Sequence, residues 1–232
     1  MFSYYAILLS LTLTVDDRSI YMIEQYRVNI EPKPDMSANV KDMYKGWLAS
    51  EVRADLDERR LPMVNVFQNL TSDFNLASGI RSNNAFLGRC VYIVGRRHYD
   101  VRGTVGTRKY EHVFHADSFD EVLAVLRADG YAVYAVDNIE RWHPKSIWDV
   151  QLPLRSAFVY GEERHGLPND VIAACDGMLF IENPGSVRSM NVACAASCVM
   201  SEYTRQHHAD MPTYGVPRNL PRMACPADGS LS

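Results

Sequence analysis

Short apolar runs rich in β-branched residues recur along the chain from residue 63 onward. Those that predict buried strands span residues 63–67, 90–94, 112–114, 131–136, 156–160 and 177–181. Helices fit between them near residues 75–87, 118–129, 168–175 and 188–206. Apolar strands that alternate with helices are typical of a parallel sheet covered on both faces. The pattern therefore predicts an α/β domain over 63–206.

The predicted helix over 118–129 carries signals at both ends. Ser118 precedes it and Glu121 follows three residues later, which is the spacing of a capping box. Gly130 stands where a helix commonly ends in a left-handed glycine. These signals support the division into separate helices and strands.

The flanking segments have other patterns. Residues 1–14 are apolar, but the run is too short to span a membrane, and without a preceding basic residue we expect no signal peptide. We expect it to cover a core edge. Apolar positions from Met43 to Leu56 follow helical spacing, so 1–62 is predicted to be an N-terminal helical extension. Four prolines predict an irregular C-terminal tail over 207–232.

The composition is that of an ordinary globular protein, with 47% apolar and 22% charged residues and a net charge of −4. It excludes a wholly disordered chain, a collagen or a coiled coil. Five cysteines occur without a CxxC pair, so we predict no zinc ribbon, no disulfide framework and no metal, and expect a reduced, cytoplasmic protein without a membrane anchor.

Charge is uneven along the chain. Residues 81–109 hold seven basic residues and one acidic residue. A local basic patch on an acidic body is typical of a face that binds nucleic-acid phosphates, although a solvated charged loop would give the same count. The candidate RNA-binding residues are Arg89, Arg96, Arg97, Arg102, Arg108 and Lys109.

Three segments rich in glycine and polar residues follow predicted strands, at the sheet edge where ligands bind in parallel sheets. Residues 75–88 begin with Asn75 and place Arg81 six residues later. Residues 160–168 hold two carboxylates between two glycines, and residues 181–192 lead through a Pro-Gly turn into a helix with Ser189 and Asn191 in its first turn. Taken singly, each also fits an ordinary turn or a capped helix.

Together and in this order, the three segments resemble the SpoU/TrmH family of the SPOUT superfamily, S-adenosylmethionine-dependent RNA methyltransferases. The matching residues are Asn75, Arg81, Ala85, Phe86 and Gly88 in the first motif, Gly161, Glu163, Gly166 and Leu167 in the second, and Ile181, Gly185, Ser189, Met190 and Asn191 in the third. The resemblance covers roughly 63–206. Glu182 and Asn183 depart from the family's Pro-Met, and Glu162 stands where Asn or Ser is usual.

The resemblance implies a fold and a site that the residue pattern alone does not give. It implies a C-terminal trefoil knot, a homodimer and S-adenosylmethionine as the cofactor, with no metal required. The implied cofactor-binding residues are Tyr160, Gly161, Glu163, Gly166, Ile181, Asn183, Gly185, Ser189 and Met190. The implied catalytic residues are Arg81, Asn75, Glu163, Ser189 and Asn191, with Arg81 serving the partner subunit's cofactor.

The activity implied is ribose 2′-O-methylation of tRNA or rRNA. The Ser-Met-Asn sequence favours ribose as the acceptor, and an N-terminal extension too short and too helical for an L30-like RNA-binding domain slightly favours tRNA. Two alternatives stay open: a base-modifying SPOUT methyltransferase and a catalytically silent SPOUT-fold RNA-binding module. A nicotinamide-binding enzyme is disfavoured, because no GxGxxG follows the first strand.

Overall fold

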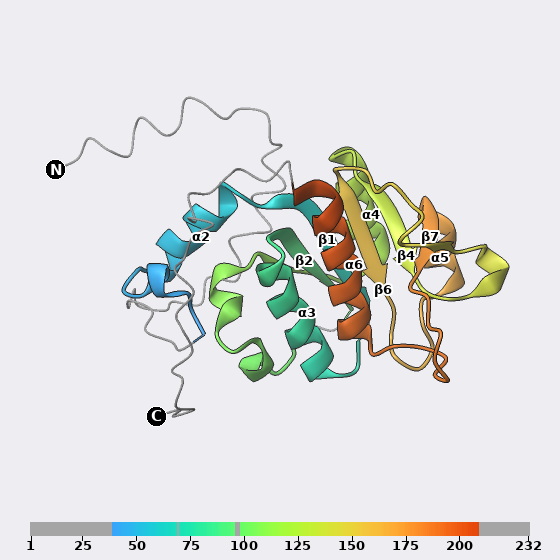
Figure 1. Cartoon of the computed structure of the whole chain (residues 1–232), viewed down its shortest axis with the longest axis horizontal. Coiled ribbons are helices and arrows are strands. Elements are labelled where there is room, and N and C mark those ends of the chain that lie inside the picture. Colours follow the sequence, from blue (N-terminus) through green and yellow to red (C-terminus); the bar gives the residue numbers. More distant parts are fainter. Residues whose placement is uncertain (1–38, 69, 96–97, 209–232) are drawn as a thin grey trace, which may run out of the picture.

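The computed structural model describes residues 39–68, 70–95 and 98–208. Its centre is a seven-stranded sheet in the order β3-β2-β1-β6-β4-β7-β5, in which neighbouring strands are parallel (Figure 1). The strands are β1 (Leu61–Gln68), β2 (Gly88–Val94), β3 (Val113–Ala116), β4 (Ala132–Val136), β5 (Lys145–Ser146), β6 (Ser156–Tyr160) and β7 (Gly177–Phe180). The predicted α/β class with a parallel sheet is confirmed.

Helices cover both faces of the sheet. One apolar core lies under α3 and α6 and includes Ile80 and Tyr203, while a second lies under α4 and α5 and includes Leu126 and Ile172. The α-helices are α2 (Ala49–Asp57), α3 (Asp73–Ala85), α4 (Phe119–Ala128), α5 (Asn169–Ala174) and α6 (Val192–His207). The 3₁₀ helices are η2 (Asp42–Tyr44), η3 (Val101–Thr104), η4 (Thr107–Tyr110) and η5 (Glu140–Trp142).

Most predicted elements occur within two or three residues of their predicted bounds. The strand over 156–160 agrees at both ends, whereas the two-residue strand β5 has no apolar run to announce it. Ser118 caps α4 by accepting from the Glu121 amide, and the Glu121 carboxylate accepts from the amide of Asp117. Gly130 has φ +72°, as expected of a glycine that follows a helix.

The N-terminal extension departs from its prediction. The helical spacing from Met43 to Leu56 corresponds to two helices instead of one, because Gly46 has φ +86° and separates η2 from α2. Tyr44 and Leu56 nevertheless pack with Tyr110 in a small third core. The predictions for residues 1–38 and 209–232 lie outside the described residues.

The segment that leads into β6 lies along the last turns of α6. The Tyr203 hydroxyl donates to the Leu154 carbonyl, and the Gln206 side chain accepts from the Leu152 amide at 2.9 Å and donates to the Val150 carbonyl at 3.0 Å. A ring nitrogen of His207 lies 3.0 Å from the Leu152 carbonyl. Residues 150–154 therefore hold the C-terminal end of α6 in place.

Candidate active site

Three side chains from the three sequence motifs form one hydrogen-bonded chain. Asn75 donates from Nδ2 to Oε1 of Glu163 at 2.6 Å, and Asn191 donates from Nδ2 to Oδ1 of Asn75 at 2.9 Å. Asn75 lies on α3 after β1, Glu163 follows β6, and Asn191 follows β7. Parallel strands end at the same edge of the sheet, which is why segments distant in sequence meet here.

Local capping interactions fix each member of this chain. Ser72 caps α3 by accepting from the Asn75 amide at 3.4 Å. Thr71 donates from its amide and its hydroxyl to Oε2 of Glu163, at 3.3 and 3.2 Å. Oδ1 of Asn191 accepts from the Ala193 amide at 2.9 Å and so caps α6. The contribution of Thr71 gave no signal in the sequence, because it depends on a contact across 92 residues.

The Glu163 carboxyl is held in its ionised form. Partial burial opposes ionisation, but the hydrogen bonds from Asn75 and Thr71 outweigh it and lower the pKa of Glu163 below its usual value. An ionised carboxylate only accepts hydrogen bonds. Glu163 therefore orients Asn75 and does not act as a general acid near neutral pH.

The glycines of the second motif are required by close packing. A Cβ at Gly161 would lie 2.3 Å from the carbonyl carbon of Gly166, and a Cβ at Gly166 would lie 2.6 Å from a carboxylate oxygen of Asp137. Gly166 also has φ +68° and donates its amide to the Glu162 carbonyl at 2.8 Å. The loop 161–166 is therefore a closed turn packed against the end of β4.

A cavity of about 460 Å³ opens beside this turn, between the loops that follow β4 and β7. Asn138 donates from Nδ2 to the Arg188 carbonyl at 2.5 Å across its rim. Its lining consists of Asn138, Glu140, Pro144, Phe180, Ile181, Asn183, Val187 and Arg188. Four of these residues are polar and four are apolar, a mixture that can hold a small organic ligand.

The predicted cofactor-binding residues divide between this cavity and its surroundings. Ile181 and Asn183 line it, whereas Gly161 and Gly166 belong to the neighbouring turn. The side chain of Tyr160 is buried and donates to Oδ1 of Asn65 at 3.1 Å, so it faces the core. The other predicted cofactor residues, Glu163, Gly185, Ser189 and Met190, are exposed in the loops after β6 and β7.

The third motif differs locally from its prediction. Helix α6 begins at Val192, so Ser189 lies in the preceding loop and Asn191 is the cap, where both were expected in the first turn. The helix starts late because the Asn191 side chain satisfies its first free amides. Cys194 is exposed and Cys198 is partly buried.

The structure does not bring Arg81 to the hydrogen-bonded chain. Arg81 lies on α3 almost two turns beyond Asn75, is exposed, and donates to Oδ1 of Asn39 at 3.4 Å. Of the five predicted catalytic residues, Asn75, Glu163 and Asn191 therefore meet, and Arg81 and Ser189 stand apart.

The predicted RNA-binding residues do not form one patch. Arg89 lies at the start of β2, at the opposite edge of the sheet from Asn75. Arg102 is paired with Asp100 at 2.5 Å, and the guanidinium of Arg108 lies 5.9 Å from the ring centre of Tyr99. Lys109 is exposed, and its backbone carbonyl accepts a hydrogen bond from Arg53. Arg96 and Arg97 are outside the described residues.

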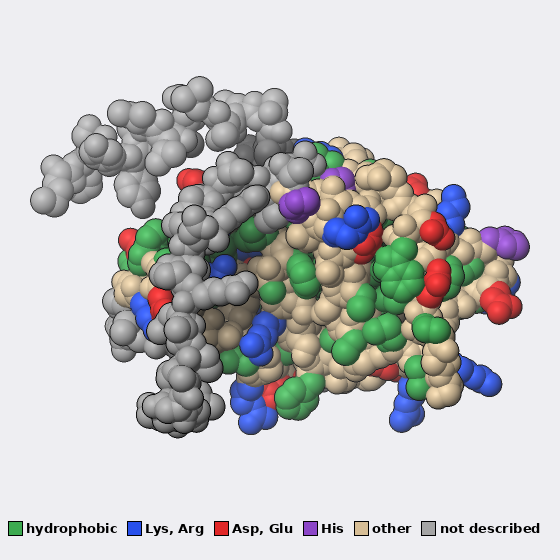
Figure 2. Space-filling model, viewed as in Figure 1, with side chains coloured by type: hydrophobic (Ala, Val, Ile, Leu, Met, Phe, Trp, Pro, Cys, Tyr) green, Lys and Arg blue, Asp and Glu red, His purple; other side chains and the backbone are tan. Residues whose placement is uncertain are grey.

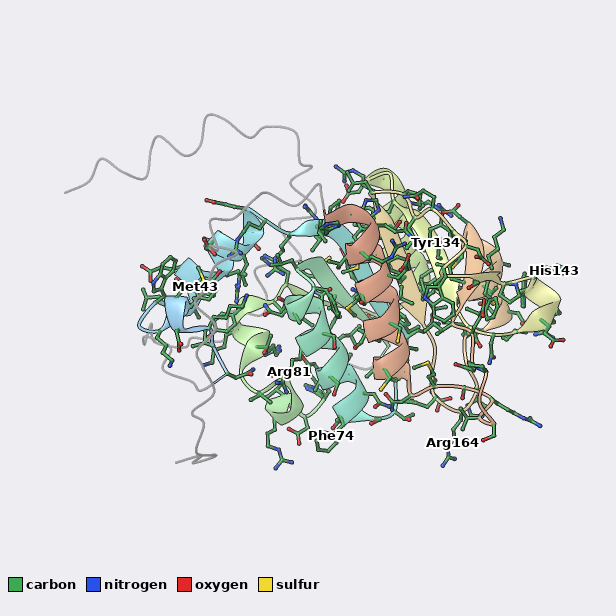
Figure 3. The ribbon with its side chains drawn as sticks, in the orientation of Figure 1. Met43, Phe74, Arg81, Tyr134, His143 and Arg164 are labelled. Atoms are coloured by element: carbon green, nitrogen blue, oxygen red, sulfur yellow. The ribbon has the colours of Figure 1, made fainter. Side chains whose placement is uncertain are left out.

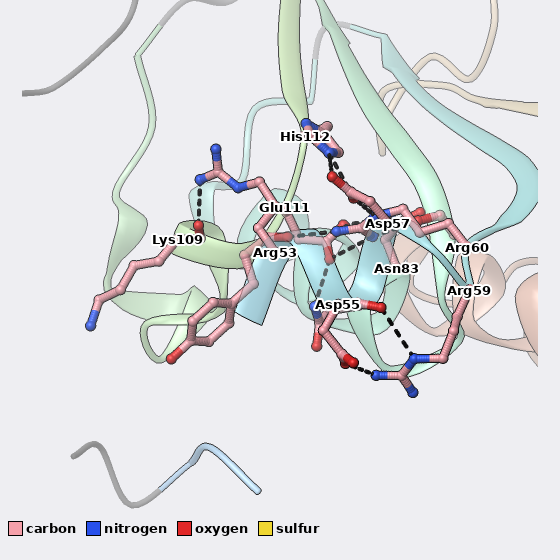
Figure 4. Close-up of polar contacts among 12 residues, drawn as sticks. Arg53, Asp55, Asp57, Arg59, Arg60, Asn83, Lys109, Glu111 and His112 are labelled. Carbon is pink, nitrogen blue, oxygen red and sulfur yellow. Dashed lines mark hydrogen bonds and ion pairs between the residues drawn. The ribbon is translucent and has the colours of Figure 1, made fainter. Parts of the chain in front are cut away.

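The end of the first motif has a structural role. Asn83 and Asn84 donate to the buried carboxylate of Glu111 at 2.5 and 2.6 Å, and Arg60 pairs with it at 3.0 Å (Figure 4). A Cβ at Gly88 would lie 2.1 Å from Oδ1 of Asn83. Gly88 is therefore needed for packing around this ion pair, at the edge of the sheet away from Asn75.

Two features are absent from the described ranges. None of their helices combines the length and apolar character needed to cross a membrane. Nor do these ranges contain three His, Cys, Asp or Glu residues grouped so as to hold a metal ion.

Known proteins share both the sequence pattern and the fold. Residues 62–201 match the SpoU rRNA Methylase family. A tRNA (guanosine(18)-2′-O)-methyltransferase of Thermus thermophilus is 28% identical over 101 residues, which cover 44% of this chain and 51% of that protein. A putative TrmH family tRNA/rRNA methyltransferase of Staphylococcus haemolyticus is 27% identical over 164 residues, 68% of this chain and 64% of that protein.

Solved structures agree with these matches. The SpoU methyltransferase AviRb of Streptomyces viridochromogenes superposes with a TM-score of 0.59 at 26% identity, covering 68% of this chain and 65% of that one. The A. aeolicus TrmH/SpoU tRNA modifying enzyme shares the fold, with a TM-score of 0.63 at 18% identity and coverage of 72% and 88%. The chain spans about half the length of the Thermus relative. Because the family match extends over more than half of its residues, the chain belongs to the SpoU rRNA methylase family.

Proposed function

We propose that this protein is an S-adenosylmethionine-dependent RNA methyltransferase that modifies the ribose 2′-hydroxyl of tRNA or rRNA. The observation that carries the proposal is the chain Asn191–Asn75–Glu163, which joins all three family motifs at one edge of the sheet. Relatives named as tRNA 2′-O-methyltransferases support ribose as the acceptor. A structure of AviRb in complex with AdoMet supports the cofactor.

The cavity beside the second motif fits such a cofactor. Phe180, Ile181 and Val187 offer apolar surface to an adenine ring, and the polar side chains of Asn138 and Asn183 offer hydrogen bonds. Gly185, Ser189 and Met190 lie in the loop that would close over the ligand. When bound, S-adenosylmethionine supplies the methyl group and its own leaving group, so this chemistry requires no metal.

The residues of this chain have to position a weak nucleophile. A ribose hydroxyl attacks efficiently only when it is held in line with the methyl group and loses its proton during the reaction. Asn75 and Asn191, which Glu163 holds in place, would contact the ribose and position it. Arg81 would hold a phosphate or stabilise the developing alkoxide, because a guanidinium stays protonated.

The role proposed for Arg81 requires a dimer. It lies apart from Asn75 in its own subunit, so the proposed role places it at the site of a second subunit. An interface of this kind would be two-fold symmetric. Of the predicted RNA-binding residues, Arg102, Arg108 and Lys109 would extend the substrate surface on each subunit. The expected location is the cytoplasm, where free cysteines stay reduced.

A C-terminal trefoil knot is part of the proposal. The hydrogen bonds of Tyr203, Gln206 and His207 to residues 150–154 support a path in which α6 passes through the loop between β4 and β6. Such threading would also hold the cavity loops in a fixed relation to α6.

The test is methyl transfer from labelled S-adenosylmethionine to total tRNA and to rRNA, with mass spectrometry of the digested nucleosides. A 2′-O-methylnucleoside is expected. A methylated base would establish the base-modifying alternative instead. Calorimetry without cofactor binding at millimolar ligand would favour a silent RNA-binding module and overturn the proposal.

A further inference from the structure

Two exposed side chains flank the hydrogen bond between Asn75 and Glu163. Phe74 directly precedes Asn75, and 71% of its surface is exposed. Arg164 directly follows Glu163 and is also exposed. Figure 3 shows both at the margin of the molecule where α3 and α6 begin, although they come from segments 90 residues apart. The proposed function assigns a role to neither.

Phe74 is presented by a rigid support. It stands in the first turn of α3, which Ser72 caps. Gly103 of η3 comes close enough on one side that a Cβ there would lie 3.6 Å from the ring. A large apolar side chain that is exposed yet held by a capped helix is ready to stack on a planar group without losing much conformational freedom.

Arg164 carries a charge that is available for a ligand. Its backbone amide donates to Oε2 of Glu162 at 3.1 Å, within the closed turn that ends at Gly166. Across the described part of the chain, its guanidinium makes no hydrogen bond or ion pair. A guanidinium fork matches the geometry of phosphate oxygens. In the space-filling view, basic side chains stand singly along this margin, with acidic and apolar side chains between them (Figure 2).

We propose that Phe74 and Arg164 together hold an unpaired segment of the RNA, next to the ribose that is methylated. Phe74 would stack on a base and Arg164 would bind a backbone phosphate. Proteins that bind single-stranded RNA commonly combine aromatic stacking with backbone cations. The inference rests on the proposed function, because it takes RNA as the substrate. Burial by a second copy of the chain would instead leave Arg164 desolvated without a counter-charge.

A single-stranded 12-mer RNA with one central 2-aminopurine is the probe. Binding to the wild type should quench the fluorescence through stacking, and Phe74→Ala should abolish the quenching and weaken binding about tenfold. Phe74→Tyr should keep both, whereas Phe74→Leu should behave like the alanine variant. Arg164→Ala should lower the slope of log Kd against log salt by about 0.7, and Arg164→Lys should restore it.

Two control variants lie elsewhere on the surface. Trp148 is 52% exposed beyond β5, at the end of the sheet, and Arg155 is exposed just before β6 begins. Trp148→Ala and Arg155→Ala should leave quenching and salt slope unchanged. Equal effects of the control and test variants would overturn the inference. So would a Phe74→Ala or Arg164→Ala variant that binds the RNA within twofold of the wild type. So would a shift of Phe74→Ala from dimer to monomer with RNA affinity unchanged.

Cofactor calorimetry on the same preparations keeps the two proposals separate. Wild-type protein that stacks 2-aminopurine through Phe74 but binds no S-adenosylmethionine would overturn the proposed function and support the nucleotide site. If the wild-type protein methylates RNA but Phe74→Ala and Arg164→Ala leave RNA affinity unchanged, the proposed function is supported and the nucleotide site is overturned.

Discussion

Asn191 donates to Asn75 across 116 residues, and the direction of that hydrogen bond is fixed by a third side chain. Glu163 is an ionised acceptor, so Asn75 must turn its Nδ2 toward it. The Oδ1 of Asn75 then faces Asn191, which must donate from its own Nδ2. That leaves Oδ1 of Asn191 free to cap α6. One carboxylate therefore sets the orientation of two amides and the start of a helix.

Asn191→Asp separates the two roles of this residue. An aspartate caps a helix as well as an asparagine does, but it would turn an acceptor toward Oδ1 of Asn75. We expect thermal stability close to wild type and methyl transfer reduced about tenfold or more. Asn191→Ala should lose both the helix cap and the hydrogen bond to Asn75, and the lost cap should lower the free energy of unfolding by about 1 kcal/mol. Thermal unfolding and single-turnover kinetics on both variants check this, and normal turnover in Asn191→Asp would refute the positional role.

Gly161 and Gly185 lie in the two cofactor loops, and substituting each of them compares a crowded glycine with an uncrowded one. A Cβ at Gly161 would meet backbone at 2.3 Å, whereas a Cβ at Gly185 would meet nothing within 4 Å. Gly161→Ala should therefore cost about 1–3 kcal/mol of stability and open the turn at 161–166. Gly185→Ala should leave the unfolding temperature unchanged. The difference is measured by thermal denaturation, with cofactor calorimetry alongside, and equal unfolding temperatures would contradict the packing argument.

The sequence predicted the central strands of the sheet well, because these strands are mostly apolar and buried. Val133, Ala157 and Phe158 illustrate this, since all three are fully buried in strands that were predicted from their residues alone. The short strand β5 and the break at Gly46 were missed, because neither changes the apolar pattern. Strand order was also beyond the sequence, since it depends on pairings between distant segments.

The site was predictable in part for a similar reason. Asn75, Glu163 and Asn191 follow strand ends, so a parallel sheet brings them together. The contact of Thr71 with Glu163 is made between loops and leaves no periodic signal. The count of charges along the sequence grouped Arg89 with Arg102. In the structure Arg89 lies at the start of β2, whereas Arg102 lies in η3, beyond the end of that strand. Gly88 looked functional by its motif, whereas it makes room for Asn83.

Glu111→Ala should destabilise the fold without touching the candidate site. The carboxylate is buried against Arg60, and its removal would take one of the two carboxylates that pair with this guanidinium, the other being Asp57. It would also remove the acceptor that Asn83 and Asn84 share. Breaking a buried pair in this way costs about 3–5 kcal/mol. Denaturant unfolding measures the loss. If it stays below about 1 kcal/mol, the ion pair does not hold the N-terminal segment to the sheet.

Because the pKa of Glu163 is lowered, we expect its titration to leave the rate of methyl transfer unchanged on the acidic side of neutral pH. Its folded-state pKa is lowered, so the hydrogen-bonded chain is intact above the ordinary value of 4.5 and is lost as pH falls through the lower folded value. Between about pH 6 and 9, the rate of methyl transfer should therefore not change through titration of Glu163. Glu163→Gln should lower the rate at every pH, and a new limb that depends on Glu163 near pH 6 would contradict this.

Arg81→Ala should abolish methyl transfer and leave cofactor affinity nearly intact. A group that meets the developing alkoxide acts mainly in the transition state, so its loss lowers the rate by about 10²–10³. Arg81→Lys should rescue little, because an ammonium lacks the planar fork. Asn39→Ala removes the hydrogen-bond partner of Arg81 in its own subunit, at 3.4 Å, and should keep the rate.

Subunit mixing then decides whose site Arg81 serves. If Arg81 acts on the partner subunit, a mixed dimer of Arg81→Ala with Asn191→Asp contains one site that has both residues intact, and activity returns. If it acts within its own subunit, each site in the mixed dimer keeps one defect and no activity returns. Activity recovered on mixing, together with a dimer mass by light scattering, therefore supports a composite site. A fully active monomer would exclude it.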